Sequence, residues 1–114
     1  MKELLNFGAA ILAAKEGKRI ARKGWNGKDM FVFIRPADTI PVKTVVETIK
    51  SLPVSVKQYY KDKYGPYYEY LSDGSPIMIT FGEYLCMKAS DGTIVNGWLA
   101  SQTDILATDW VSLD

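Results

Sequence analysis

Histidine is absent from this sequence of 114 residues, and cysteine occurs once, as Cys86. A single cysteine cannot form an intramolecular disulfide, and a chain without imidazole lacks the commonest general base and a common metal ligand. These absences exclude Ser-His-Asp and Cys-His nucleophilic sites, and we expect neither a metal nor a cofactor. Carboxylate chemistry is the catalytic class left open. We interpret Cys86 as a small core residue of a strand.

Long apolar runs are missing too. No segment reaches the roughly 18 apolar residues that a membrane-spanning helix needs, and the N-terminus lacks the charged-then-apolar build of a signal peptide. We therefore expect a cytoplasmic protein with no membrane partner. The length and the 47% hydrophobic content fit one ordinary domain over residues 1–114.

Positive charge is missing from the C-terminal part, because all 14 lysines and arginines lie at or before Lys88. The net charge is only +1, yet basic residues clearly outnumber acidic ones over residues 1–35. Duplex DNA binding usually needs a broader basic field. A local basic excess on a nearly neutral chain instead suits a small phosphate-bearing ligand, so we expect a nucleotide-like partner and no nucleic acid.

The N-terminal third predicts a helix, a strand, a turn and a second strand. Asn6 is a typical N-cap and Gly17 a typical left-handed stop for a helix over residues 7–16. An Asn-Gly pair at 26–27 indicates a tight turn, and strand-forming residues follow over 30–34.

The segment over about 37–76 differs from both flanks, because all five prolines lie between residues 36 and 76. We interpret it as an insertion with helices over 42–52 and 56–64, and Pro53 separates these helices. The pattern then returns to strands, expected over residues 77–81, 84–88, 93–99 and 110–113. Together these features predict an α+β fold, with a small antiparallel sheet, an N-terminal helix packed on it and a partly helical insertion.

The stretch from Gly97 to Asp104 places an aromatic ring, two hydroxyls, an amide and a carboxylate just after an expected strand. Trp98 offers a flat face to a purine, and Gln102 and Asp104 can bond the hydroxyls of a ribose. A structural alternative stays open, in which Ser101 caps a short helix over residues 102–107 with Asp104 at its third position. The two interpretations are compatible, since a helix N-terminus also presents free amides to an anion.

A second aromatic candidate is Trp25, which stands beside Arg22, Lys23 and Asn26. A nucleobase and a phosphate can share such a group of one ring and two cations. The structural alternative is that Trp25 closes one end of the core while the cations are solvated.

The insertion is rich in tyrosine and lysine. Interfaces favour tyrosine, so we prefer packing on the sheet or a subunit contact over stacking on a second ligand or on single-stranded nucleic acid. The residues concerned are Tyr59, Tyr60, Tyr64, Tyr67 and Tyr68, with Lys57, Lys61 and Lys63.

Two acidic pairs keep an enzymatic alternative open. Glu69 with Asp73, or Asp104 with Asp109, would supply the acid and the base of a small nucleotide-processing hydrolase that uses carboxylates. The spacing does not compel such a pairing, and charged residues are usually solvated surface. We therefore favour a binding protein without catalytic residues.

Motifs on both sides of the insertion resemble the second Thoeris anti-defence family. These small phage proteins sequester the glyco-cyclic ADP-ribose signal that bacterial TIR-domain immune enzymes make. The resemblance covers residues 5–36 and 84–113 and leaves the middle uncovered. The motifs are N-F-G at 6–8, E-G-K at 16–18, A-R-K-G-W-N-G at 21–27, W-L-A-S-Q-T-D at 98–104 and D-W at 109–110.

The resemblance implies a homotetramer in the host bacterial cytoplasm that holds its ligand in pockets between subunits without chemical turnover. For some members it also implies cyclic dinucleotides at separate pockets. Carried onto this chain, the signal pocket would contain Trp25, Trp98, Ser101, Gln102, Thr103 and Asp104, with Phe7, Gly8 and Asn96 as secondary candidates.

Two departures bear on this transfer. Short family members lack most of residues 37–76, so the insertion can add subunit contacts or reshape a second pocket. Asn96-Gly97 stands where members often have a proline before the tryptophan, which leaves the role of Asn96 open.

Overall fold

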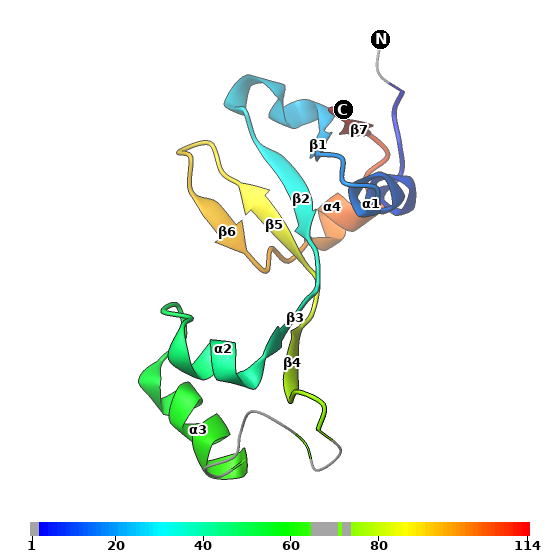
Figure 1. The fold of residues 1–114 in the computed structure, drawn as a ribbon. Coiled ribbons are helices and arrows are strands. Elements are labelled where there is room, and N and C mark those ends of the chain that lie inside the picture. The colour runs from blue at the N-terminus through cyan, green and yellow to red at the C-terminus, as the bar shows by residue number, and fades with distance from the viewer. Residues whose placement is uncertain (1–2, 65–70, 72–73) are drawn as a thin grey trace. The chain divides into compact units, whose positions relative to one another are not determined.

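A computed structural model describes residues 3–64, 71 and 74–114 of the chain, and it divides the chain into two compact units. Unit 1 combines the N-terminal segment up to Pro36 with the C-terminal segment from Glu83 onward, and unit 2 is Ala37–Gly82. Each unit has its own strands and helices (Figure 1).

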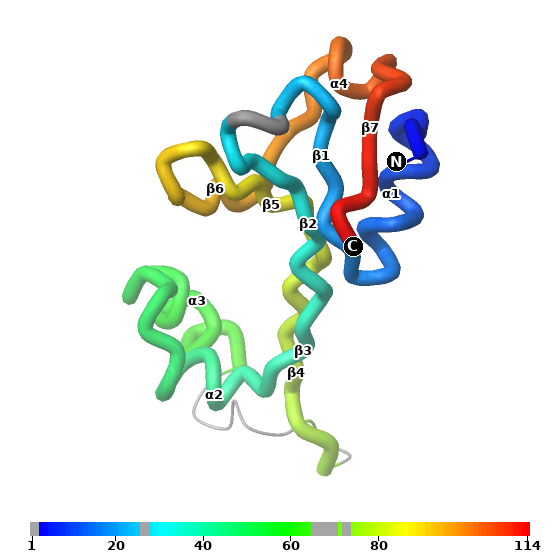
Figure 2. The backbone as a smooth tube through the Cα atoms, turned by 90° about the horizontal axis from the view of Figure 1, so that it is seen from above, coloured from blue at the N-terminus to red at the C-terminus, as the bar shows by residue number. Residues whose placement is uncertain are grey.

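Unit 1 is built on a five-stranded sheet whose strand order, among the described residues, is β6-β5-β2-β1-β7. All neighbouring strands are antiparallel, and Figure 2 shows β1 lying between β2 and β7. The expected antiparallel sheet is therefore confirmed. Its strands are β1 (Ile20–Arg22), β2 (Phe31–Arg35), β5 (Tyr84–Lys88), β6 (Ile94–Asn96) and β7 (Trp110–Ser112).

Helix α1 (Phe7–Lys15) packs on this sheet through contacts with β1, β2 and β7. The Asn6 side chain accepts a hydrogen bond from the Ala9 N–H at 2.8 Å, which caps the helix start. Gly17 has a φ of 90°, so the left-handed stop is also confirmed. An N-terminal helix on an antiparallel sheet is the α+β arrangement that the sequence predicts.

The core of unit 1 lies between α1 and one face of the sheet. Ala10 of α1, Ile20, Val32 and Trp110 are completely buried and belong to one cluster with Met87. Ile20 pairs with Val32, and Val32 pairs with Met87, so these side chains point to the same face. Small residues on the helix let it approach the sheet closely.

Two connections in unit 1 differ from the expectation. The chain joins β1 to β2 through the 3-10 helix η1 (Lys23–Lys28), which ends at Asp29 in the left-handed region. The expected tight turn at 26–27 is therefore wrong, because the connection already curves at Lys23. Strand β6 is shorter than the expected 93–99, since Gly97 has a φ of 71° and interrupts the extended backbone.

Unit 2 contains a two-stranded antiparallel sheet of β3 (Asp38–Pro41) and β4 (Met78–Phe81), with helices α2 (Val42–Glu47) and α3 (Val54–Tyr64). Strand β3 is not among the strands predicted from the sequence. Because β3 pairs with β4, unit 2 extends to Gly82. The expected residues Tyr67, Tyr68, Glu69 and Asp73 lie outside the described part of the chain.

The core of unit 2 is formed by Val42, Val46 and Ile77. Tyr60 and Tyr64 of α3 pack against it, so these two tyrosines belong to the core of unit 2 itself, whereas Tyr59 is 56% exposed. Across both units, no helix in the described part of the chain has the length and apolar character needed to cross a membrane.

Candidate functional site

All three tryptophans of the chain meet in unit 1, and we call Trp25, Trp98 and Trp110 the tryptophan cluster. The ring centroids lie 5.3 Å apart for Trp25 and Trp110, 6.3 Å for Trp25 and Trp98, and 6.4 Å for Trp98 and Trp110. Each pair meets edge to face, which is a favoured aromatic geometry. Trp110 is completely buried, while Trp25 and Trp98 are half-buried and keep part of their rings accessible.

Each ring of the tryptophan cluster is placed by its backbone. Trp25 lies in η1, and the Trp98 N–H donates to the Leu85 carbonyl at 2.8 Å just after β6. Trp110 begins β7 and exchanges two backbone hydrogen bonds with Leu5, at 2.7 and 3.0 Å. Phe7 at the start of α1 packs on the Trp110 ring at 5.4 Å. Trp25 thus packs against the core, as its structural interpretation predicts.

Helix α4 (Gln102–Leu106) borders this cluster. The Ser101 hydroxyl accepts a hydrogen bond from the Asp104 N–H at 3.1 Å, which confirms the capping interpretation of Ser101. The side chains of Ser101, Gln102 and Thr103 are exposed, so they are accessible to a ligand.

Asp104 links α4 to the tryptophan cluster. Its backbone carbonyl accepts the indole N–H of Trp110 at 2.8 Å, and its carboxylate accepts Arg22 Nη1–H at 3.1 Å. Arg22 also donates its Nε–H to the Asp109 carboxylate at 2.9 Å. The hydrogen bonds that Arg22 donates to Asp109 and, to a lesser extent, to Asp104 raise the pKa of Arg22 above its ordinary value.

This arrangement changes the expected use of two groups. The guanidinium of Arg22 donates to two carboxylates through Nε and Nη1, so its charge is engaged within the fold, whereas Lys23 is exposed. Asp104 and Asp109 do converge, but on Arg22, which donates to one oxygen of each carboxylate. The other acidic pair of the hydrolase alternative lies outside the described residues.

Two of the predicted site residues, Asn96 and Gly8, lie outside the tryptophan cluster. Asn96 pairs with Cys86, whose buried thiol lies 3.5 Å from the Asn96 amide oxygen. Since Met87 points into the core under α1, Cys86 and Asn96 point to the opposite face of the sheet. Gly8 is exposed on α1, and a Cβ there would meet only the Asn6 side chain, at 3.6 Å.

Elsewhere in unit 1 there is a hollow of about 180 Å³. It is smaller than the roughly 300–1,000 Å³ of typical ligand pockets, so it cannot enclose a dinucleotide. Among the described residues no group of three or more acidic or cysteine side chains is placed to hold a metal ion. The residues lining the hollow are Ile11, Lys15, Ile34, Glu83, Tyr84 and Leu85.

Trp110 and the bridge from Arg22 to Asp104 and Asp109 are missing from the site that the sequence predicts. Arg22 is separated from the two aspartates by 82 and 87 residues, so no local pattern indicates these contacts. The usable signal was the D-W motif at residues 109–110, because a large ring in a strand is typical of the core.

Comparison with known proteins identifies the family. The chain matches the Thoeris anti-defense 2-like domain over residues 5–113. It is also 32% identical over 110 residues to a curated protein described as Thoeris anti-defense 2 from Bacillus phage SP01, covering 96% of each chain. Both matches run through the middle segment that the motif resemblance leaves uncovered. The chain therefore belongs to the Thoeris anti-defense 2-like family, which includes a Thoeris anti-defense protein of a phage.

Proposed function

We propose that this protein is an anti-defence sponge that binds glyco-cyclic ADP-ribose and withholds it from the host immune system without degrading it. The observation that carries the proposal is the tryptophan cluster, where two accessible rings lie beside the polar residues of α4. Family membership supports the same conclusion.

The chemistry of the ligand matches this arrangement. Trp25 and Trp98 offer aromatic surface to the adenine, and Ser101, Gln102 and Thr103 offer hydroxyl and amide groups to the ribose hydroxyls. The exposed ammonium of Lys23 supplies positive charge for the pyrophosphate. Sites of this kind are mostly apolar with a few placed polar groups.

A sponge acts by stoichiometric capture, so its affinity matters and a turnover rate does not. To compete with an immune effector its Kd should be nanomolar or tighter, about −12 kcal/mol or more favourable. Isothermal titration calorimetry with glyco-cyclic ADP-ribose measures this affinity. Trp98→Ala should abolish capture, and nanomolar binding by that variant would place the pocket elsewhere.

The rival function is a hydrolase that uses carboxylates as acid and base. Incubating the protein with the signal, heating it and analysing the released molecule separates the two functions. The sponge returns the signal unchanged, whereas a chemically altered product would establish degradation.

We further propose that the protein acts as a homotetramer in the cytoplasm of the infected host, with signal pockets between subunits and a separate pocket for cyclic dinucleotides. Large exposed apolar side chains near the site support an assembly, because Leu99 is 90% and Leu106 77% exposed. Native mass spectrometry of protein taken from signal-producing cells reports subunit number and bound molecules together. A monomer carrying the signal would overturn the tetramer and retain the sponge.

A further inference from the structure

Helix α4 contacts α1 but has little packing of its own to hold it in place. It contains five residues, and none of them is buried. An isolated helix of this length does not persist in water, because the hydrogen bonds of one turn do not offset the entropy of fixing it. Its position therefore depends on bonds to its neighbours.

Asp104 carries those bonds at three different groups. Its N–H donates to the Ser101 hydroxyl at 3.1 Å, its carbonyl accepts the Trp110 indole N–H at 2.8 Å, and its carboxylate accepts Arg22 Nη1–H at 3.1 Å. The first bond is internal to the α4 cap. The other two tie the helix to β7 and to β1.

Arg22 is itself held in a fixed orientation. Its Nε–H donates to Asp109 at 2.9 Å, and the neighbouring Lys23 N–H donates to the Asp109 carbonyl at 2.9 Å. The side chains of Arg22, Asp104 and Asp109 are 24%, 17% and 34% exposed, so solvent screens these pairs only in part. A planar guanidinium presents its N–H groups in a rigid fork, which lets one side chain bind two carboxylates at defined angles.

We propose that Arg22 is a positioning residue of the candidate site: it holds Asp104, and through it α4, against the tryptophan cluster, so that ligand affinity depends on Arg22 without a direct contact. The inference rests on the proposed function for its binding readout. It also assigns the Asp104 carboxylate to Arg22 in place of a ribose hydroxyl. One guanidinium with two carboxylates carries one net negative charge, so Arg22 leaves no positive charge over for a phosphate, and that role stays with Lys23.

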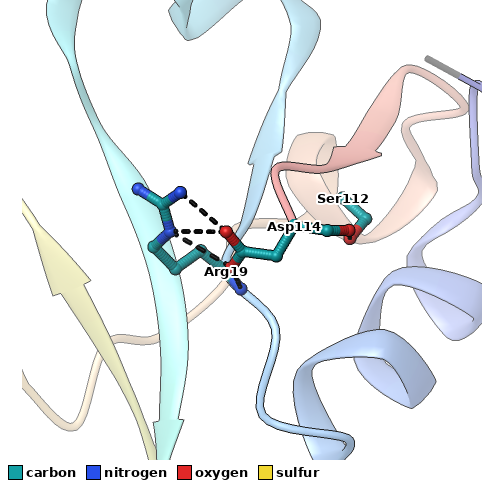
Figure 3. Close-up of polar contacts among 3 residues, drawn as sticks. All are labelled: Arg19, Ser112 and Asp114. Carbon is teal, nitrogen blue, oxygen red and sulfur yellow. Dashed lines mark hydrogen bonds and ion pairs between the residues drawn. The ribbon is translucent and has the colours of Figure 1, made fainter.

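The test compares Arg22→Gln with Arg19→Gln. Arg19 is a matched control in the same unit, because Arg19 Nη2 donates to the Asp114 carboxylate at 2.7 Å and Nε donates to it at 3.2 Å (Figure 3). Each variant loses one guanidinium paired with carboxylate, but the Arg19 pair lies outside the tryptophan cluster. A general effect of losing an ion pair would appear in both variants.

Calorimetry with glyco-cyclic ADP-ribose, well below the unfolding temperature, gives the first readout. We expect Arg22→Gln to lose about tenfold or more in affinity, because it loses the charged hydrogen bonds that hold Asp104, and such bonds are stronger than neutral ones. The affinity of Arg19→Gln should change less than about twofold, because the Arg19 pair lies outside the tryptophan cluster. Near-ultraviolet circular dichroism of the free protein gives the second readout, because every tryptophan of the chain lies in the cluster. The spectrum should change in Arg22→Gln only.

Arg22→Lys is the second variant, and it replaces Arg22→Gln if the latter does not fold. Lysine keeps the charge but lacks the fork, so it should recover part of the affinity and not all of it. Wild-type affinity in a folded Arg22→Gln or in Arg22→Lys would overturn the proposal. Failure of the wild type to bind the signal would refute the proposed function instead, and an unchanged tryptophan spectrum in the ligand-free Arg22 variants would then refute the positioning role by itself.

Discussion

In unit 1 the Trp110 side chain is completely buried and donates its indole N–H to the Asp104 carbonyl. Its ring is in contact with Phe7 and with both other tryptophans. Trp110 therefore links the hydrophobic core to the candidate site. A substitution of Trp110 should reduce the stability of the fold more than it changes direct contacts with a ligand.

Trp110→Phe keeps an aromatic ring but removes the indole donor. We expect a loss of about 1–3 kcal/mol in the free energy of unfolding, because the Asp104 carbonyl loses its 2.8 Å partner in a partly buried position. Urea unfolding followed by far-ultraviolet circular dichroism measures the loss. Trp98→Phe, at a half-buried ring, is the control and should cost less; equal losses would contradict the central role of Trp110.

A substitution at Gly8 distinguishes a role in folding stability from a role in ligand binding. A Cβ at this position meets only the Asn6 side chain at 3.6 Å, and alanine is the better helix former. Gly8→Ala should therefore leave stability unchanged or raise it by up to about 1 kcal/mol. Thermal unfolding tests this expectation, and a lower Tm would show a constraint on the backbone that the contacts do not reveal. Loss of signal binding in a stable variant would place the ligand against this turn of α1.

At the scale of single elements, the two capped helices differ in how much they depend on their caps. Helix α1 has nine residues and two buried alanines, so tertiary packing supports it as well as the Asn6 cap. Helix α4 has five residues and no buried side chain, so the Ser101 cap contributes a larger share of its stability.

Ser101→Ala removes that cap, whereas Ser101→Asp keeps an oxygen that can accept the Asp104 N–H. We expect the alanine variant to lose about 1 kcal/mol of unfolding free energy and the aspartate variant to retain most of it. Urea unfolding of both variants measures the difference. Equal losses in the two variants would show that capping is not what Ser101 contributes.

At the scale of the whole molecule, the salt bridge of Lys88 with Asp29 joins β5 to the end of η1. The Lys88 ammonium lies 2.8 Å from the Asp29 carboxylate and lowers the pKa of that carboxyl below its ordinary value. A depressed folded-state pKa gives stability that is present above the unfolded-state pKa and is lost as the pH falls through the folded-state pKa.

Asp29→Asn removes this titration without disturbing the backbone, because asparagine tolerates the left-handed conformation of the residue, whose φ is 51°. The wild type should be the more stable form at pH 6, and its advantage should shrink as the pH is lowered below about 4. Urea midpoints of both proteins at pH 6 and pH 3 test the sign. An advantage that grows towards acid would contradict the assignment.

Unit 1 should fold without unit 2. Its described core cluster draws only on residues before Pro36 or after Glu83, and Arg35 of β2 pairs directly with Tyr84 of β5. An Asn-Gly turn joining Arg35 to Tyr84 would close these strands as a two-residue hairpin. We expect this shortened chain to keep the near-ultraviolet spectrum of the tryptophan cluster, and loss of that spectrum would show that unit 1 needs the insertion.

Four local features were predictable from the sequence: the helix start at Asn6, the helix end at Gly17, the strand at Tyr84–Lys88 and the Ser101 cap. Each depends on neighbouring residues, because capping and strand alternation act over a few positions. Two local rules failed where tertiary packing competed with them. Trp25 packs into the core from η1 in place of a tight turn, and β3 forms although it ends at Pro41, because β4 offers a pairing edge.

The sequence by itself determined the fold class, the absence of imidazole chemistry and the residues from which the candidate site is drawn. Only the tertiary structure decided that the three tryptophans meet, that Asn96 points to the other face of the sheet, and that Arg22 binds both aspartates. These contacts join segments separated by up to 87 residues. Such contacts depend on how α1 and the sheet pack around one core. A local sequence pattern does not show which distant residues meet there.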